Sequence, residues 1–214
     1  VGSEMCIRDS VKPGKNVLTL KIYRWSTGSY LECQDFWRIS GIERDVFLYS
    51  QPKAALKDFR VTSTLDDTYK DGIFKLGVDL RNNGSTAGNM TLVYELLDAN
   101  GKVVATGEKA TNVAAGETRT VSFDQTLPDV KTWSSEAPNL YKLVMTVKEN
   151  GKVNEIIPFN VGFRRIEIKP TEQLARNGKP YVCLFINGQP LKLKGVNIHE
   201  PVSYTHLRAH ETSA

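Results

Sequence analysis

A short segment that mixes aromatic and charged residues is the part of this sequence best suited to chemistry. Residues 24–48 read RWSTGSYLECQDFWRISGIERDVFL. Flat aromatic faces can cover the apolar side of a sugar ring, and the segment supplies three: Trp25, Phe36 and Trp37. Asp35 and Arg38 can hold the sugar hydroxyls, because a carboxylate accepts hydrogen bonds and a guanidinium donates them. The segment is therefore compatible with a carbohydrate pocket.

A purely structural role accounts for the same residues. The aromatic side chains can close the rim of a β-sandwich while Arg38 pairs with Glu43 or Asp45. Composition alone favours this second interpretation.

A second group of candidate residues lies near the C-terminal end, in the segment KLKGVNIHE. Asn197, His199 and Glu200 stand there at the end of a strand-like run. An isolated histidine is more often structural than functional. His206 and His210 have helical i, i+4 spacing, but the atypical sequence around them argues against a metal site shared with His199. The sequence contains no phosphate-binding glycine loop, nucleophile elbow or His-Glu-x-x-His motif.

Alternating apolar residues indicate the elements that position these groups. Residues 17–25 (VLTLKIYRW) and residues 41–50 (GIERDVFLYS) both alternate as strands do. Pro52 ends the second run, because proline cannot donate a hydrogen bond to a sheet. We expect a domain boundary at that point.

A series of short strands follows, separated by turn signals. The expected strands are FRVTSTL, FKLGVDLRN, MTLVYELLD, KVVATGEKA, TRTVSFDQTL, YKLVMTVKE and KVNEIIPFNV. Asn100-Gly101 and Asn150-Gly151 are hairpin signals, because both residues tolerate positive φ. This pattern predicts an immunoglobulin-like β-sandwich held by packing alone, since the usual cysteine pair is absent. A further hairpin is expected on Asn187-Gly188, leading into a strand over residues 191–196.

Bulk properties restrict the class of protein. The 214 residues carry a diffuse net charge of +4 without a basic run, which argues against nucleic-acid binding. No apolar stretch is long enough to span a membrane. The three cysteines, Cys6, Cys33 and Cys183, fit neither a disulfide framework nor a zinc site. The N-terminus lacks a secretion signal, and the compartment stays open between cytoplasm and periplasm.

Both ends of the chain look foreign to the rest. Residues 1–10 (VGSEMCIRDS) and 201–214 (PVSYTHLRAHETSA) resemble translated sequencing-adapter read-through. We therefore expect both to be artefacts and the authentic sequence to run from about residue 11 to residue 200.

Three motifs together resemble the β-galactosidases of glycoside hydrolase family 2. The segment around Asp35 is similar to the family pattern RWSxGSYLExQDxWRxSGIxRDV. Residues 133–141 (WSSEAPNLY) resemble the hallmark of the family's central sandwich, and GVNIHE resembles the first strand of its catalytic barrel. Ile198 departs from the arginine common in the family, which leaves substrate preference open.

The resemblance implies a mainly β fold: an immunoglobulin-like β-sandwich flanked by a truncated jelly-roll sandwich and the first strand of a (β/α)8 barrel. Residues 11–51 would end the sugar-binding jelly roll, residues 52–162 would form the sandwich, and residues 163–200 would begin the TIM barrel. It assigns substrate binding to Asp35, Asn197 and His199, and sodium ligation to Asp35. The signature at residues 133–141 is expected to be structural.

The resemblance also implies retaining hydrolysis of β-galactosides by two glutamates about 5 Å apart. Both glutamates would follow residue 200, so the fragment is expected to be inactive. The full-length enzyme would use magnesium and sodium and would form homo-oligomers, whereas the fragment would bind neither ion tightly.

Two alternatives remain. A β-glucuronidase or β-mannosidase of the same family would share the second and third motifs but not the segment around Asp35. A non-catalytic carbohydrate-binding sandwich would not need the barrel strand.

Overall fold

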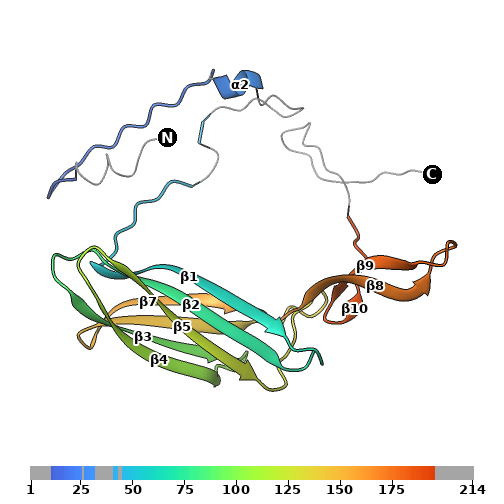
Figure 1. The fold of residues 1–214 in the computed structure, drawn as a ribbon. Helices are drawn as coiled ribbons and strands as arrows, with labels where there is room; N and C mark the ends of the chain where they lie inside the picture. Colours follow the sequence, from blue (N-terminus) through green and yellow to red (C-terminus); the bar gives the residue numbers. More distant parts are fainter. Residues whose placement is uncertain (1–10, 26, 32–40, 43–44, 196–214) are drawn as a thin grey trace. The chain divides into compact units, whose positions relative to one another are not determined.

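The computed structural model describes residues 11–25, 27–31, 41–42 and 45–195 of the chain (Figure 1). The chain divides into two compact units. One comprises residues 1–48 and 194–214, and the other comprises residues 49–193.

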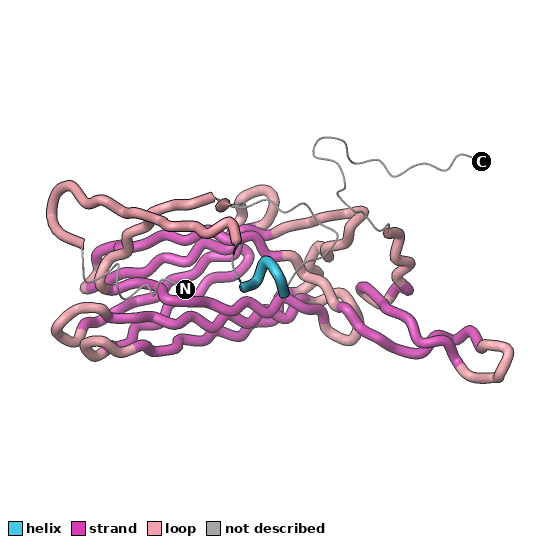
Figure 2. The backbone as a smooth tube through the Cα atoms, turned by 90° about the horizontal axis from the view of Figure 1, so that it is seen from above, coloured by secondary structure: helices cyan, strands magenta, loops and turns pink. Residues whose placement is uncertain are grey.

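The second unit contains a sandwich of two antiparallel sheets (Figure 2). One sheet has the order β1-β2-β5, formed by β1 (Ala54–Leu65), β2 (Gly72–Asn82) and β5 (Thr118–Leu127). The other has the order β4-β3-β6-β7, formed by β3 (Gly88–Leu97), β4 (Val103–Val113), β6 (Tyr141–Glu149) and β7 (Lys152–Val161). The predicted β-sandwich is confirmed, and each of its seven strands lies where the alternation of apolar residues indicates.

The core forms because every second side chain of the central strands points between the sheets. In β2 these are Phe74, Leu76, Val78 and Leu80, which are 0–1% exposed. Residues of β3 and β6 face them from the other sheet: Met90, Leu92, Tyr94, Leu96, Leu143, Met145 and Val147. Aromatic rings of the two sheets meet at the centre, where the centroids of Tyr94 and Phe123 are 4.8 Å apart.

Two of the predicted hairpin turns are confirmed by their backbone angles. Asn150 and Gly151 have φ of 49° and 83°, and Asn187 and Gly188 have φ of 48° and 78°. Positive φ at both central residues gives the turn a twist that matches the strands it joins. The first turn joins β6 to β7, and the second joins β9 to β10.

A small sheet follows the sandwich. It contains β8 (Ile166–Leu174), β9 (Pro180–Ile186) and β10 (Gln189–Pro190) in the order β10-β9-β8. The expected strand over residues 191–196 is not present in its described part, because strand structure ends at Pro190. A strand needs a neighbour to receive its hydrogen bonds. Beyond the bond from Leu191 N–H to the Leu184 carbonyl, the described chain supplies residues 191–195 with no such ladder.

The first unit departs from the strand predictions. Residues 17–25 and the described residues of 41–50 contain no strand. Among the described residues of this unit, the regular element is the short helix α2 (Thr27–Leu31). Apolar side chains of these segments are exposed, including Val17 at 82% and Leu48 at 89%. Apolar and polar residues do alternate in these segments, but the described part of the unit contains no strand with which they could pair.

Among the described residues, no helix is long and apolar enough to cross a bilayer.

Candidate functional site

The predicted substrate and metal residues lie outside the described residues. Asp35, Asn197 and His199 all belong to this group, as do Phe36, Trp37 and Arg38. Their predicted roles therefore stay predictions. Trp25 is described and is 55% exposed, and the Arg24 guanidinium carbon lies 5.4 Å from the centroid of its ring.

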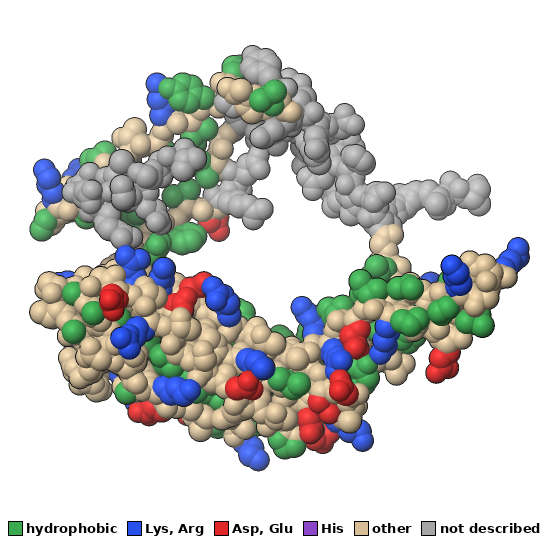
Figure 3. All heavy atoms as spheres, in the orientation of Figure 1, with side chains coloured by type: hydrophobic (Ala, Val, Ile, Leu, Met, Phe, Trp, Pro, Cys, Tyr) green, Lys and Arg blue, Asp and Glu red, His purple; other side chains and the backbone are tan. Residues whose placement is uncertain are grey.

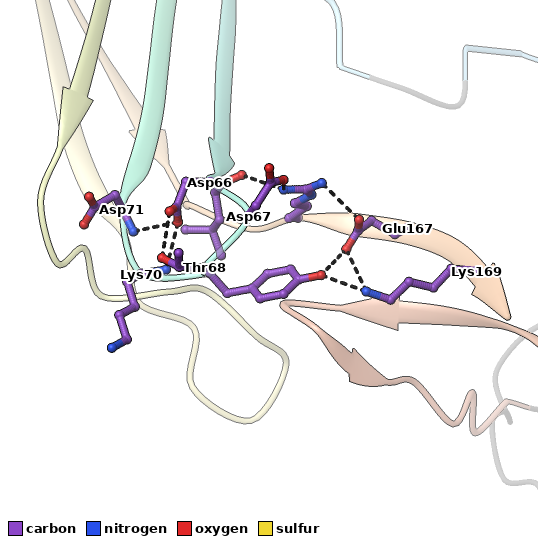
Figure 4. Close-up of polar contacts among 10 residues, drawn as sticks. Asp66, Asp67, Thr68, Lys70, Asp71, Glu167 and Lys169 are labelled. Atoms are coloured by element: carbon purple, nitrogen blue, oxygen red, sulfur yellow. Dashed lines mark hydrogen bonds and ion pairs between the residues drawn. The ribbon is translucent and has the colours of Figure 1, made fainter. Parts of the chain in front are cut away.

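The principal cluster of ionisable side chains in the described chain lies where β8 meets the end of the sandwich (Figure 4). Tyr69 comes from the loop between β1 and β2, and its hydroxyl donates a hydrogen bond to Glu167 Oε2 at 2.7 Å. The ammonium group of Lys169 donates to the same hydroxyl at 2.8 Å. Glu167 and Lys169 are two residues apart on β8, so both side chains lie on the face of the strand that meets Tyr69.

Arg165 joins the cluster to the β1–β2 loop. Its guanidinium lies 2.7 Å from Asp67 Oδ1 and 3.1 Å from Glu167 Oε1. One guanidinium thus bridges a carboxylate of the sandwich and a carboxylate of β8. We name the side chains of Asp67, Tyr69, Arg165, Glu167 and Lys169 the junction cluster.

The contacts within the cluster favour the ionised forms of Glu167 and Lys169. The hydrogen bond from Tyr69, followed by the positive charges of Arg165 and Lys169, lowers the pKa of Glu167. The hydrogen bond to Tyr69 and the charge of Glu167 raise the pKa of Lys169. The acid of a glycosidase needs a carboxyl group that stays protonated, which requires a raised pKa. Glu167 has the opposite shift, so it does not suit the role of a catalytic acid.

Another carboxylate, that of Asp66, closes the β1–β2 loop that carries Tyr69. Asp66 Oδ2 accepts a hydrogen bond from the Thr68 hydroxyl at 2.7 Å, and Oδ1 accepts from the backbone N–H groups of Lys70 and Asp71. The bond from Thr68, with those from the backbone, lowers the pKa of Asp66 to about 2. Asp66 therefore fixes the loop and leaves Tyr69 in place at a φ of 59°.

The signature at residues 133–141 packs against the segment that enters β8. Trp133 N–H donates to the Phe163 carbonyl at 2.8 Å, and its ring lies 4.6 Å from the Arg164 guanidinium carbon. The Asn187 side chain donates to the Trp133 carbonyl at 3.0 Å and accepts from Arg165 N–H at 2.9 Å. A turn residue of the small sheet thus connects both segments, which is a packing role.

Two hollows open at the surface of the sandwich. One, of about 570 Å³, lies between the β3–β4 turn and the β5–β6 connection and is bordered by Asp98, Lys102, Asp129 and Leu140. The other, of about 540 Å³, lies along β1 and β7 beside Trp133 and Phe159. The described chain contains no group of three or more His, Cys, Asp or Glu residues that could hold a metal ion.

The sequence motifs did not identify the junction cluster. Its residues come from two segments about a hundred residues apart, and neither segment carries a recognisable motif. The available signal was the alternation Arg165, Glu167, Lys169, because in extended chain it puts three charges on one side.

Family models match both parts of the chain. Residues 54–164 match the model described as glycosyl hydrolases family 2. Residues 1–52 match the model for the sugar binding domain of the same family. The chain belongs to glycosyl hydrolase family 2. The resemblance stated from the three motifs is thereby confirmed at the level of the family.

Curated relatives of this family 2 chain are β-galactosidases. The enzyme of Priestia megaterium is 40% identical over 200 residues, which is 92% of this chain and 18% of the relative. The enzyme of Streptococcus thermophilus is 39% identical over 198 residues, which is 92% of this chain and 17% of the relative. The chain thus spans less than one-fifth of the length of these relatives.

Solved structures show the same fold. A β-glucuronidase of Bacteroides uniformis superposes with a TM-score of 0.67 at 20% identity, covering 78% of this chain and 20% of that one. A putative β-galactosidase of Bacteroides fragilis superposes with a TM-score of 0.53 at 23% identity, covering 62% of this chain and 18% of that one. At these identities the likeness establishes the family 2 sandwich fold alone.

Proposed function

We propose that the complete protein containing this chain is a retaining β-galactosidase that releases terminal non-reducing β-D-galactose from β-galactosides such as lactose. The observation that carries the proposal is the identity of 40% to the Priestia megaterium β-galactosidase over 92% of the chain. The structural neighbours include β-glucuronidases, but their identity of 18–24% to this chain supports the fold and not a sugar.

In this proposal the chain contributes binding residues and a scaffold. Asp35, Asn197 and His199 would contact the galactose, and the two catalytic glutamates would lie in the part of the enzyme that follows. A retaining mechanism needs two carboxyl groups about 5 Å apart, one of them with a raised pKa. The partners of Glu167 in the junction cluster lower its pKa, so this carboxylate does not suit the role of acid.

The metal proposals follow from the donor chemistry. A carboxylate is a suitable oxygen ligand for a hard cation such as sodium or magnesium, and we propose Asp35 as one ligand of a sodium ion. One carboxylate does not complete a site, so the remaining ligands and the magnesium site would come from other parts of the enzyme. We likewise propose homo-oligomers for the complete enzyme.

The test uses a chimaera in which this chain replaces the matching 200 residues of the Priestia megaterium enzyme. Hydrolysis of nitrophenyl β-galactoside and nitrophenyl β-glucuronide is measured for the chimaera and for the chain of 214 residues. We expect the chimaera to hydrolyse the galactoside and the chain alone to hydrolyse neither. A folded chimaera without galactosidase activity would contradict the proposal, and preference for the glucuronide would support the alternative enzyme.

Asp35→Asn in the chimaera tests the proposed binding role. Loss of the carboxylate should raise KM for the galactoside. It should also abolish the stimulation of hydrolysis by sodium chloride that we expect in the parent chimaera. Asp45→Asn, a carboxylate in the same segment, is the matched control and should retain the parent's KM.

A further inference from the structure

Five asparagines of this chain are directly followed by glycine, and such pairs are open to a spontaneous chemical change. The pairs are Asn83-Gly84, Asn100-Gly101, Asn150-Gly151, Asn177-Gly178 and Asn187-Gly188. Glycine carries no side chain that would shield its amide nitrogen, so the side chain of the preceding asparagine reaches that nitrogen easily. The local sequence therefore makes all five pairs reactive, and the folded structure decides which of them react.

The reaction, deamidation, needs water and no other reactant. The glycine nitrogen loses its proton to hydroxide and attacks the asparagine Cγ. The Cγ–Nδ2 bond then breaks, ammonia leaves with a proton from water, and a five-membered succinimide ring remains. Water opens this ring at either carbonyl carbon, which gives aspartate or isoaspartate. Nothing is oxidised or reduced, because asparagine and water give a carboxylic acid and ammonia.

Three of the pairs have a glycine N–H that already donates a hydrogen bond. These bonds run from Gly84 to Asn82 Oδ1 at 2.8 Å, from Gly101 to the Asp98 carbonyl at 3.0 Å and from Gly178 to the Ala175 carbonyl at 2.9 Å. The nitrogen attacks only after it has lost the proton in that bond, so the bond must break first. We therefore expect the fold to protect Asn83, Asn100 and Asn177.

The other two pairs form a matched comparison, because Asn150-Gly151 and Asn187-Gly188 share one turn conformation. The asparagines have φ of 49° and 48°, and the glycines have φ of 83° and 78°. The Asn187 side chain is held at both ends: its amide group donates to the Trp133 carbonyl at 3.0 Å, and its Oδ1 accepts from Arg165 N–H at 2.9 Å. Turning its Cγ toward the next nitrogen breaks both bonds, so Asn187 is protected as well.

Asn150 lacks this protection. Both Asn150 and Gly151 are exposed, and within the described chain no hydrogen bond holds the Asn150 side chain or engages the Gly151 N–H. A Cβ on Gly151 would meet no atom beyond its chain neighbours within 4 Å, so water and hydroxide reach its nitrogen. We propose that Asn150 is a site of spontaneous deamidation, at which the β6–β7 turn acquires aspartate or isoaspartate.

Modification at this position alters an element of the fold. The turn joins β6 to β7 and lies at the end of β7 away from the small sheet (Figure 1). Isoaspartate carries the backbone through its own side chain, so it adds one carbon to a turn whose twist matches its two strands. β7 is at the edge of its sheet, where it pairs with β6. We expect faster amide exchange in β7 of the isoaspartate form and unchanged exchange in β2.

The first experiment follows all five pairs in the chain of 214 residues. The protein is incubated at mildly alkaline pH, in buffer and in guanidinium chloride, and mass spectrometry of its peptides measures the loss of each asparagine. In the denaturant, the five asparagines should react at similar rates, because each precedes glycine. In buffer, Asn150 should react roughly tenfold faster than Asn187, because Asn187 must first break its hydrogen bonds.

Two results would overturn the proposal, once each rate in buffer is divided by the rate in the denaturant. One is an equal rate for Asn150 and Asn187, which would show that the side-chain hydrogen bonds of Asn187 give no protection. The other is a faster reaction at Asn83, Asn100 or Asn177 than at Asn150, which would show that a bonded glycine N–H does not slow the attack.

A charge measurement on two variants tests the site independently. Deamidation exchanges a neutral amide for a carboxylate, so the formal net charge falls by one unit, from +4 to +3. Positive and negative side chains are interspersed over the visible face of the sandwich (Figure 3), so no run of one sign masks the change. Cation-exchange chromatography of the incubated chain should therefore show a growing species that elutes earlier.

Asn150→Gln should suppress this species, because glutamine would have to form a less favourable six-membered ring. Asn100→Gln is the matched control, since Asn100 is also an exposed turn residue that precedes glycine. It should leave the growth of the species unchanged. Persistence of the species in Asn150→Gln, or its suppression in Asn100→Gln, would contradict the assignment to Asn150.

Discussion

The hydroxyl of Tyr69 donates a 2.7 Å hydrogen bond to Glu167, a residue 98 positions later in the chain. This bond joins the β1–β2 loop of the sandwich to β8, and Lys169 donates to the same hydroxyl at 2.8 Å. One phenol group thus contributes two of the hydrogen bonds that orient the β8–β9 hairpin on the sandwich.

Tyr69→Phe should loosen this attachment. The hydrogen bond from Tyr69 is the largest of the effects that lower the pKa of Glu167. Without it the ionised carboxylate is less stable relative to the protonated acid, so this pKa should rise toward the ordinary value of 4.5. Because the native pKa is lowered, the carboxylate contributes stability above its ordinary pKa and loses it as the pH falls through the native value. Carbon-detected NMR titration of Glu167 measures the shift. Tyr181→Phe, on β9 and 48% exposed, is the control and should leave the titration unchanged.

Hydrogen exchange gives an independent readout of the same variant. Amide exchange in β8 and β9 should become roughly tenfold faster in Tyr69→Phe, because a hydrogen bond to a charged group is worth about that factor in an opening equilibrium. Exchange in β3 and β6 should stay as in the parent. Faster exchange throughout the sandwich would instead indicate that Tyr69 supports the whole fold.

Thr68→Val should make the sandwich more sensitive to acid. The Thr68 hydroxyl is the largest of the effects that lower the pKa of Asp66 to about 2, so its removal should raise that pKa toward 3.8. Asp66 stabilises the fold above pH 3.8 and loses this contribution as the pH falls through about 2. The acid-unfolding midpoint, followed by circular dichroism, should therefore move to higher pH. The same midpoint in Thr62→Val, on β1, is the comparison; an equal shift there would contradict a specific role for Thr68.

The sandwich could be predicted from sequence because its strands obey one simple rule. Alternating burial in β2 places Phe74, Leu76 and Val78 in the core, and Asn150-Gly151 fixes the register of the β6–β7 hairpin. Local pattern and tertiary packing agree at these positions.

The rule failed where a strand depends on a partner that the described residues do not supply. Residues 17–25 alternate as well as β2 does, but an alternating segment without a neighbour cannot satisfy its backbone groups as a sheet. The junction cluster was missed for another reason. Tyr69 lies in a loop, and no local pattern shows that a loop residue will meet β8 about a hundred residues later.

Tyr94→Phe should stabilise the protein. Tyr94 is fully buried between the sheets, and its hydroxyl has no hydrogen-bond partner among the described residues. Burial without a partner costs free energy, and it also raises the pKa of this phenol. Removing the hydroxyl should increase the free energy of unfolding by about 1 kcal/mol, as measured by urea denaturation.

Tyr141→Phe provides the opposite case for comparison. The Tyr141 hydroxyl accepts a hydrogen bond from Lys131 N–H at 2.9 Å, and the side chain is 8% exposed. Its removal should decrease the free energy of unfolding by about 1 kcal/mol. If both variants lose the same free energy of unfolding, the Tyr94 hydroxyl has a hydrogen-bond partner in solution, and the prediction that Tyr94→Phe stabilises the protein is wrong.

Two glycines of β2 should respond differently to the same substitution. A Cβ at Gly72 would lie 2.8 Å from the Phe163 ring and from Val130 Cγ1, and Phe163 is fully buried. A Cβ at Gly77 would meet only the Ser122 hydroxyl oxygen, at 3.9 Å. Gly72→Ala should therefore decrease the free energy of unfolding by about 1–3 kcal/mol, because a packed core accommodates an added methyl group only by moving side chains. Gly77→Ala should increase the free energy of unfolding by about 0.5 kcal/mol, because alanine loses less conformational entropy than glycine when a strand folds. Urea denaturation of both variants measures the difference, and equal free energies of unfolding would show that the end of the sandwich at Phe163 is not closely packed.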